Sequence, residues 1–164
     1  MFAYALRMGV AKENPCSRIV LPERQESEKK IFTIEETQAF LDALDGEPQR
    51  YVVFFVLAIF GGYRREELLG FEFRDFNFTT NVVTVERVSL YDPAHGIFTG
   101  PPKTARSHRS LKLPVWIFDM VKALRAEQSM RRMELGDQWH ESGRLFTKLD
   151  GSPARPGDFY DWGK

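Results

Sequence analysis

Cysteine is almost absent from this sequence, because Cys16 is the only one in 164 residues. One thiol can build neither a disulfide framework nor a zinc cluster, so both kinds of small stabilised fold are excluded. This cysteine usage favours a reducing compartment, and we expect a cytoplasmic protein. We expect Cys16 itself to be a partly buried, inert thiol.

Long hydrophobic runs are also missing. The apolar run YVVFFVLAIF covers only residues 51–60, whereas a membrane span needs about twenty residues. The start of the chain carries no long apolar segment after a basic one, so we expect no signal peptide. We therefore expect no membrane partner and predict that residues 51–60 form a buried helix.

An excess of charge of either sign is lacking as well, since 23 basic residues balance 23 acidic ones. This balance counts mildly against nucleic-acid binding. The charges are unevenly spread, however, because residues 93–118 contain no Asp or Glu and residues 32–49 contain no Lys or Arg. The basic residues of the first stretch are Lys103, Arg106, Arg109 and Lys112. Such a basic ribbon can bind a phosphate backbone locally in a neutral protein.

The stretch GGYRREELLGFEFRDFNF, residues 61–78, follows the apolar run directly. An arginine buried at the end of an apolar helix is costly unless an anionic group meets it. Glu67 lies three residues after Arg64, so both would share one face of a helix. The glycines at 61 and 62 allow the backbone to turn there. We expect a buried Arg64 that meets a carboxylate or a phosphate.

A second basic motif, GPPKTARSHRSLKLP, occupies residues 100–114. It follows VVTVERVSL at 82–90, which alternates and is predicted to be a strand, and the loop YDPAHG at 91–96. Taken alone, Lys103 is an ordinary loop lysine. Arg106, Arg109 and Lys112 are compatible with a solvated strand face or with phosphate contacts that read no bases.

Together the two motifs resemble the two arginine- and lysine-bearing boxes of the tyrosine recombinase (phage integrase) family, in the same order. The first reads Gly62-Tyr63-Arg64-Arg65-Glu66-Glu67-Leu68, with Phe73 where the family usually has tryptophan. The second reads Pro102-Lys103-Thr104, followed by Arg106 and Arg109 and ending in Leu113-Pro114. The resemblance covers nearly the whole chain.

The resemblance implies a domain organisation and a fold. Residues 1–15 look like the last helix of the family's N-terminal, DNA-clamping domain, and residues 16–31 look like a linker. Residues 32–164 look like the N-terminal part of the catalytic domain. We expect an α+β fold, mostly helical, with a small antiparallel sheet of two to three strands.

The resemblance also implies a chemistry. Members of the family cut DNA by attack of a tyrosine on a phosphodiester, through a DNA-3′-phosphotyrosine intermediate, without a metal or other cofactor. By this likeness Arg64 binds the phosphate, Lys103 donates a proton to the leaving oxygen, and Glu67 supports Arg64. The expected DNA contacts are Arg65, Thr104, Arg106 and Arg109. The alternatives are a purely structural Arg64–Glu67 pair and an Arg65 that meets solvent or an acid. DNA and other recombinase protomers are the expected partners.

Two further parts of the family's active site, the His-Xaa-Xaa-Arg motif and the tyrosine nucleophile that follows it, do not occur in the sequence. No His-Xaa-Xaa-Arg motif exists, because the residues three positions after the histidines are Phe98, Leu111 and Gly143. Tyr160 and Trp162 are predicted to be packing aromatics and not a nucleophile. We expect a fragment that is not competent alone. The alternative is a non-enzymatic DNA-binding remnant of a decayed mobile element.

Local patterns predict the helices. They are expected at about residues 2–9, from Thr33 onward, at about 49–60 and 65–69, and after Pro114. Ile34, Leu41 and Leu44 are predicted to line the inner face of the second helix. An extended segment is predicted at residues 145–146 and a turn at 150–151.

Overall fold

The computed structural model describes residues 2–20, 31–102 and 108–159, and the chain divides into two units, residues 1–33 and 34–164. The first unit contains α1 (Phe2–Arg7) and a 3-10 turn, Pro15–Arg18. Neither element has a buried residue, and Cys16 is exposed. The prediction of a partly buried Cys16 is therefore wrong, because these short elements build no core around it. The assignment of residues 1–15 and 16–31 to a preceding domain and a linker stays a prediction.

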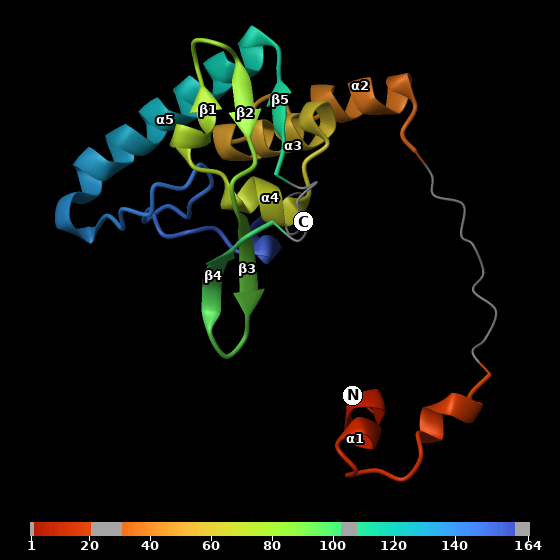
Figure 1. Ribbon diagram of the computed structural model, residues 1–164. Coiled ribbons are helices and arrows are strands. Elements are labelled where there is room, and N and C mark those ends of the chain that lie inside the picture. The colour runs from red at the N-terminus through yellow and green to blue at the C-terminus, as the bar shows by residue number, and fades with distance from the viewer. Residues whose placement is uncertain (1, 21–30, 103–107, 160–164) are drawn as a thin grey trace. The chain divides into compact units, whose positions relative to one another are not determined.

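The helices of the second unit are α2 (Ile34–Asp42), α3 (Gln49–Gly61), α4 (Arg65–Gly70) and α5 (Val115–Leu135) (Figure 1). These helices confirm the predicted ones, and the predicted helix ends agree with the observed ends to within a residue or two. Gly62 ends α3 in the left-handed conformation, with φ of 57°, and its N–H donates to the carbonyl of Ala58. The prediction that Ile34 lines the inner face of α2 is wrong, because Ile34 is 84% exposed. Helix α2 contains no buried residue, and the buried residue of this region is Leu44, just after the helix ends.

Two small antiparallel sheets accompany these helices, so the predicted α+β class is confirmed. One has the order β1 (Phe76–Asn77), β2 (Val82–Thr84), β5 (Ser110–Lys112), and the other is the hairpin β3 (Val88–Asp92) and β4 (Gly96–Gly100). The predicted strand at 82–90 is thus interrupted at residues 85–87 and serves both sheets. The interruption coincides with Arg87, which turns to Asp75 and forms an ion pair of 2.6 Å between Nη1 and Oδ2.

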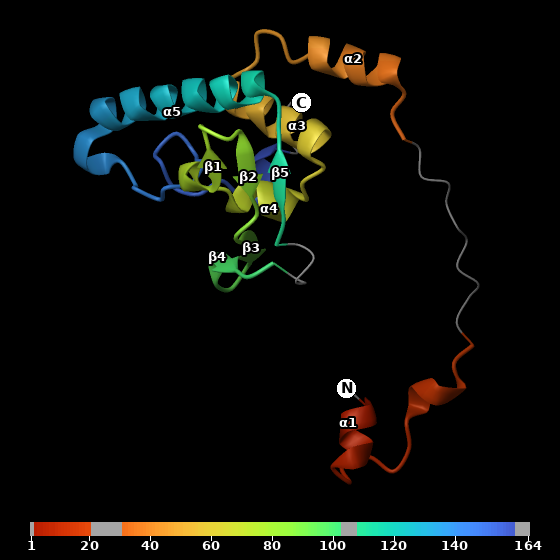
Figure 2. The same cartoon turned by 45° about the horizontal axis from the view of Figure 1, so that its top comes forward.

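The core lies between α3, α5 and the sheet β1-β2-β5. Helix α5 runs beside α3 in both views (Figures 1 and 2). Leu145 and Phe146, from the predicted extended segment, are fully buried. The buried hydrophobic side chains of the two helices are Val53, Phe54, Val56, Leu57, Ile117, Phe118, Val121 and Leu124. In the described part of the chain, no helix has the length and apolar character needed to cross a membrane.

Helix α4 is fixed against the hairpin by a close backbone approach and by a buried arginine. A Cβ atom on Gly70 would lie 2.6 Å from the carbonyl oxygen of Arg87. Arg144, which is buried, donates to the carbonyl of Gly70 and to Oγ1 of Thr99 at 2.5 Å. Burial lowers the pKa of Arg144 below its usual value, although the nearby carboxylate of Glu72 opposes this shift. These contacts fix the position of the hairpin β3–β4 relative to α4 and its arginine motif.

Candidate functional site

Arg64 lies at the junction between α3 and α4. It precedes the first turn of α4 in an extended conformation, with φ of −69° and ψ of 151°. Its side chain is 69% exposed, whereas that of Glu67 is only 2% exposed. The expectation of a buried Arg64 is therefore wrong. The turn at Gly62 carries the chain out of the apolar helix first, and the carboxylate is the member of the pair that is buried.

Glu67 both caps α4 and holds the arginine. Its Oε2 atom accepts a hydrogen bond from the backbone N–H of Arg64 at 2.9 Å. Its Oε1 atom accepts from Nη1 of Arg64 at 3.0 Å. The carboxylate thus satisfies a backbone donor at the helix start and fixes one end of a guanidinium.

Arg109 reaches the same carboxylate from the second motif, 42 residues further along the chain. Its Nη1 and Nη2 atoms donate to Oε1 and Oε2 of Glu67 at 3.1 and 3.0 Å. Its Nη2 also donates to the carbonyl of Gly62 at 3.3 Å, and the guanidinium lies 5.3 Å from the centre of the Tyr63 ring. Arg109 is therefore held by α4 and the preceding turn.

One carboxylate between two guanidinium groups leaves the cluster Arg64–Glu67–Arg109 with a net positive charge. Burial alone would raise the pKa of Glu67, but the hydrogen bonds from Arg109 and from the backbone and side chain of Arg64 lower it below its usual value. Burial raises the pKa of Tyr63 to about 12, although the Arg109 charge opposes this rise. Glu67 is thus ionised and Tyr63 neutral at physiological pH.

The remaining predicted site residues divide into two groups. Arg65 pairs with an acid, since its Nη2 lies 2.7 Å from Oε1 of Glu66, which agrees with one of the alternatives. Lys103, Thr104 and Arg106 lie outside the described residues, as do Tyr160 and Trp162. Their predicted roles stay predictions.

Tyr63 borders the cluster Arg64–Glu67–Arg109, and its contact with Arg109 was not predicted from the sequence. It is 5% exposed, and its hydroxyl is buried without a hydrogen-bond partner in the described part of the chain. Its ring packs edge-on against Phe71, at 4.9 Å between ring centres, and forms the floor beneath Arg109. No local pattern links Tyr63 to Arg109, because the two come together only when β5 pairs with β2.

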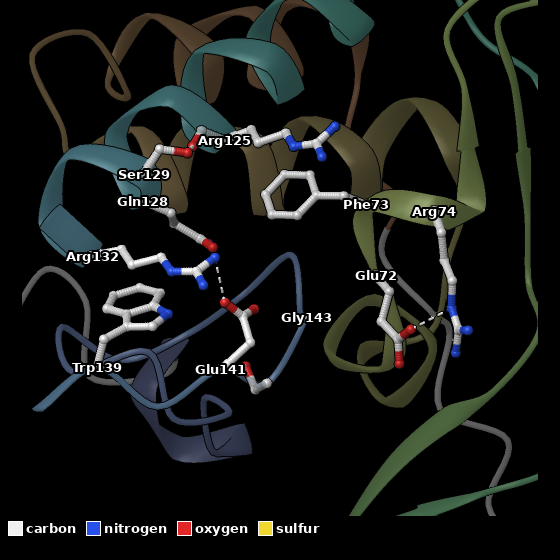
Figure 3. A pocket seen from close by; sticks show the side chains of 11 residues that line it. Glu72, Phe73, Arg74, Arg125, Gln128, Ser129, Arg132, Trp139, Glu141 and Gly143 are labelled. Atoms are coloured by element: carbon white, nitrogen blue, oxygen red, sulfur yellow. Dashed lines mark hydrogen bonds and ion pairs between the residues drawn. The ribbon is translucent and has the colours of Figure 1, made fainter. Parts of the chain in front are cut away.

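A hollow of about 550 Å³ lies elsewhere, between the turn Phe73–Asp75, the second half of α5 and residues 139–143 (Figure 3). Arg132 pairs with Glu141 at 2.8 Å and Arg74 with Glu72 at 2.6 Å. Arg125 lies over the ring of Phe73. None of the cluster residues lines this hollow. Among residues 2–20, 31–102 and 108–159, no three His, Cys, Asp or Glu side chains gather closely enough to hold a metal ion.

Comparison with known proteins gives consistent relatives, although no family model matches the sequence. The chain is 31% identical to a tyrosine recombinase XerC-like protein of Caldanaerobacter subterraneus subsp. tengcongensis, over 89% of this chain and 41% of that protein. It is 27% identical to an integrase of Streptomyces ambofaciens, over 91% of this chain and 39% of that protein. The chain therefore spans about two fifths of the length of these curated relatives.

The fold matches that of solved integrase structures. The Tn1549 transposon integrase in complex with transposon right end DNA superimposes with a TM-score of 0.70 at 19% identity. The match covers 93% of this chain and 49% of that one. The same integrase with a circular intermediate DNA gives a TM-score of 0.69. At this level of identity the likeness establishes the fold.

Proposed function

The chain belongs to the tyrosine recombinase family, and we propose that it is part of a site-specific DNA recombinase in which Arg64 binds the phosphate that is exchanged. The observation that carries this proposal is the exposed guanidinium of Arg64, anchored at Nη1 by the buried carboxylate of Glu67. A cation fixed in advance costs little reorganisation when negative charge develops in front of it.

The chemistry requires such a cation. A tyrosine oxygen attacks the phosphorus, the bond from phosphorus to the 5′-oxygen breaks, and the non-bridging oxygens carry extra negative charge between these events. Arg64 uses one side-chain N–H for Glu67, and its Nη2 and Nε have no partner among the described residues. Those donors form an edge that can give two parallel hydrogen bonds to phosphate oxygens.

Lys103 completes the proposed chemistry as the donor of the proton that the leaving 5′-oxygen takes up. Arg65, Thr104 and Arg106 are proposed as further phosphate contacts. The assignment of Arg65 rests on the likeness of the first motif to that of the family, and the others rest on the likeness of the second. DNA as the partner is supported by the Tn1549 integrase, which was solved in complex with DNA. Other recombinase protomers and a cytoplasmic location belong to the same proposal.

This chain alone is proposed to bind DNA without cutting it, because its sequence contains no His-Xaa-Xaa-Arg motif. The second candidate is a non-enzymatic DNA-binding remnant. The gene distinguishes the two. A reading frame that continues into a His-Xaa-Xaa-Arg motif and a tyrosine supports the recombinase, and the longer product should then form a covalent adduct with a suicide duplex. Arg64→Ala should abolish that adduct.

Binding of a labelled duplex at increasing salt tests the role of Arg64 in this chain. We expect weak, sequence-tolerant binding whose log K falls against log salt with a slope of order a few. Arg64→Ala should reduce that slope by about 0.9, the value for one phosphate contact. Arg125→Ala removes the same charge outside the cluster and should leave the slope unchanged. An equal effect of both variants, or none for Arg64→Ala, would refute the proposal.

A further inference from the structure

The guanidinium of Arg109 is directed inward, which distinguishes it from that of Arg64. Of its five N–H donors, both on Nη2 and one on Nη1 are used, by the two oxygens of Glu67 and the carbonyl of Gly62. One face of the group lies over the Tyr63 ring. Arg109 would have to leave these partners to give a phosphate its paired donors.

The carboxylate of Glu67 is saturated by the two arginines. A carboxylate offers about four acceptor positions. Glu67 receives four hydrogen bonds, two from Arg64 and two from Arg109. Because Glu67 is buried, the loss of Arg109 would leave half of these positions empty inside the protein. The carboxylate would then protonate or move, and either change would release Arg64.

Arg109 is itself held by the sheet. Its carbonyl accepts a hydrogen bond from the N–H of Val85 at 2.9 Å, directly beside the pair Thr84 and Ser110 of β2 and β5. The guanidinium therefore connects the sheet that carries the second motif to the helix that carries the first.

We propose that Arg109 is a positioning residue: it locks Glu67, and through Glu67 it sets the orientation of Arg64 toward the phosphate. This inference rests on the proposed function of Arg64. It replaces the expectation, drawn from the sequence, that Arg109 is itself a DNA contact.

Arg109→Lys separates the two roles, since lysine keeps the charge and loses the bidentate fork. A positioning role predicts that Arg109→Lys weakens duplex binding as much as Arg64→Ala does, about tenfold at low salt for one lost contact. The double variant Arg64→Ala/Arg109→Lys should then bind no more weakly than Arg64→Ala alone. Arg125→Lys is the matched control and should bind like the wild type.

A readout that needs no DNA keeps the two proposals distinguishable. NMR titration of the Glu67 carboxyl carbon should give a higher pKa in Arg109→Lys than in the wild type, and Arg109→Gln serves the same purpose if the lysine variant does not fold. An unchanged carboxyl titration, or additive losses in the double variant, would overturn the positioning role. If the chain binds no duplex at all but the Glu67 titration shifts, the proposed phosphate role of Arg64 is refuted, whereas the locking of Glu67 by Arg109 is supported.

Discussion

Glu67 lies between two guanidinium groups, so its ionisation contributes to folding as well as to the proposed site. Its pKa is lowered in the folded protein because the hydrogen bonds from Arg109 and Arg64 outweigh burial. A carboxyl whose pKa is lower when folded adds stability above its unfolded pKa, which is about 4.3 for glutamate. This stability is lost as the pH falls through the lower, folded pKa.

Glu67→Gln should therefore change how stability depends on pH. At neutral pH we expect the free energy of unfolding to fall by about 1–3 kcal/mol, since charge-assisted hydrogen bonds are replaced by weaker ones. Below about pH 4 the difference from wild type should shrink. Urea denaturation over a series of pH values measures both effects. Glu66→Gln is the control: its partly exposed carboxylate also pairs with an arginine on α4, and its effect should be smaller. Equal effects of the two variants would contradict the special role of Glu67 between Arg64 and Arg109.

The contacts of Glu67 with Arg64 and Arg109 could be predicted from the sequence only in part. The spacing of Arg64 and Glu67 on one helix face indicates their contact, and the structure confirms it. Which partner is buried depends on the turn at Gly62, and the sequence pattern does not determine that. The contact of Arg109 with Glu67 depends on strand pairing over 42 residues, which no local periodicity encodes.

At the level of elements, the junction between α4 and β3 depends on a glycine. Gly70 ends α4 where its backbone passes close to that of Arg87 and Val88. Backbone atoms cannot move aside as a flexible side chain can. The short helix that carries Glu67 is therefore placed by the absence of a side chain at its last residue.

Gly70→Ala should destabilise the protein by about 2–3 kcal/mol, the upper part of the range for overpacking, because the new Cβ would lie 2.6 Å from a backbone oxygen. Gly157→Ala is the matched control, since a Cβ there meets nothing within 4 Å. Thermal unfolding followed by circular dichroism compares the two variants. A Gly70→Ala variant as stable as Gly157→Ala would show that the junction is looser than described.

The elements also show where local patterns suffice. The apolar run and the glycines after it predict a helix at 49–60, and α3 spans Gln49–Gly61. The alternation at 82–90 predicts one strand, but the ion pair of Arg87 with Asp75 accompanies a break between two sheets. A β-branched pattern shows that a segment is extended, but it does not show which partner the segment chooses.

At the scale of the whole molecule, a neutral chain carries a locally positive cluster. The even balance of 23 basic and 23 acidic residues conceals this arrangement, because the charges are segregated along the sequence. The order of the two motifs indicated the family and the α+β class before any geometry. Lys103, Thr104 and Arg106 lie outside the described residues, so their proposed roles have to be tested by experiment.

The central claim is that Arg64 is a phosphate-binding cation held by Glu67, and the most direct measurement observes its guanidinium. Nε–H resonances of the ¹⁵N-labelled chain would be followed by NMR as a short duplex is added. We predict that the Arg64 signal shifts on binding, that added salt reverses the shift, and that the Arg125 signal does not move. An Arg64 signal that stays fixed while other arginine signals shift would contradict the account.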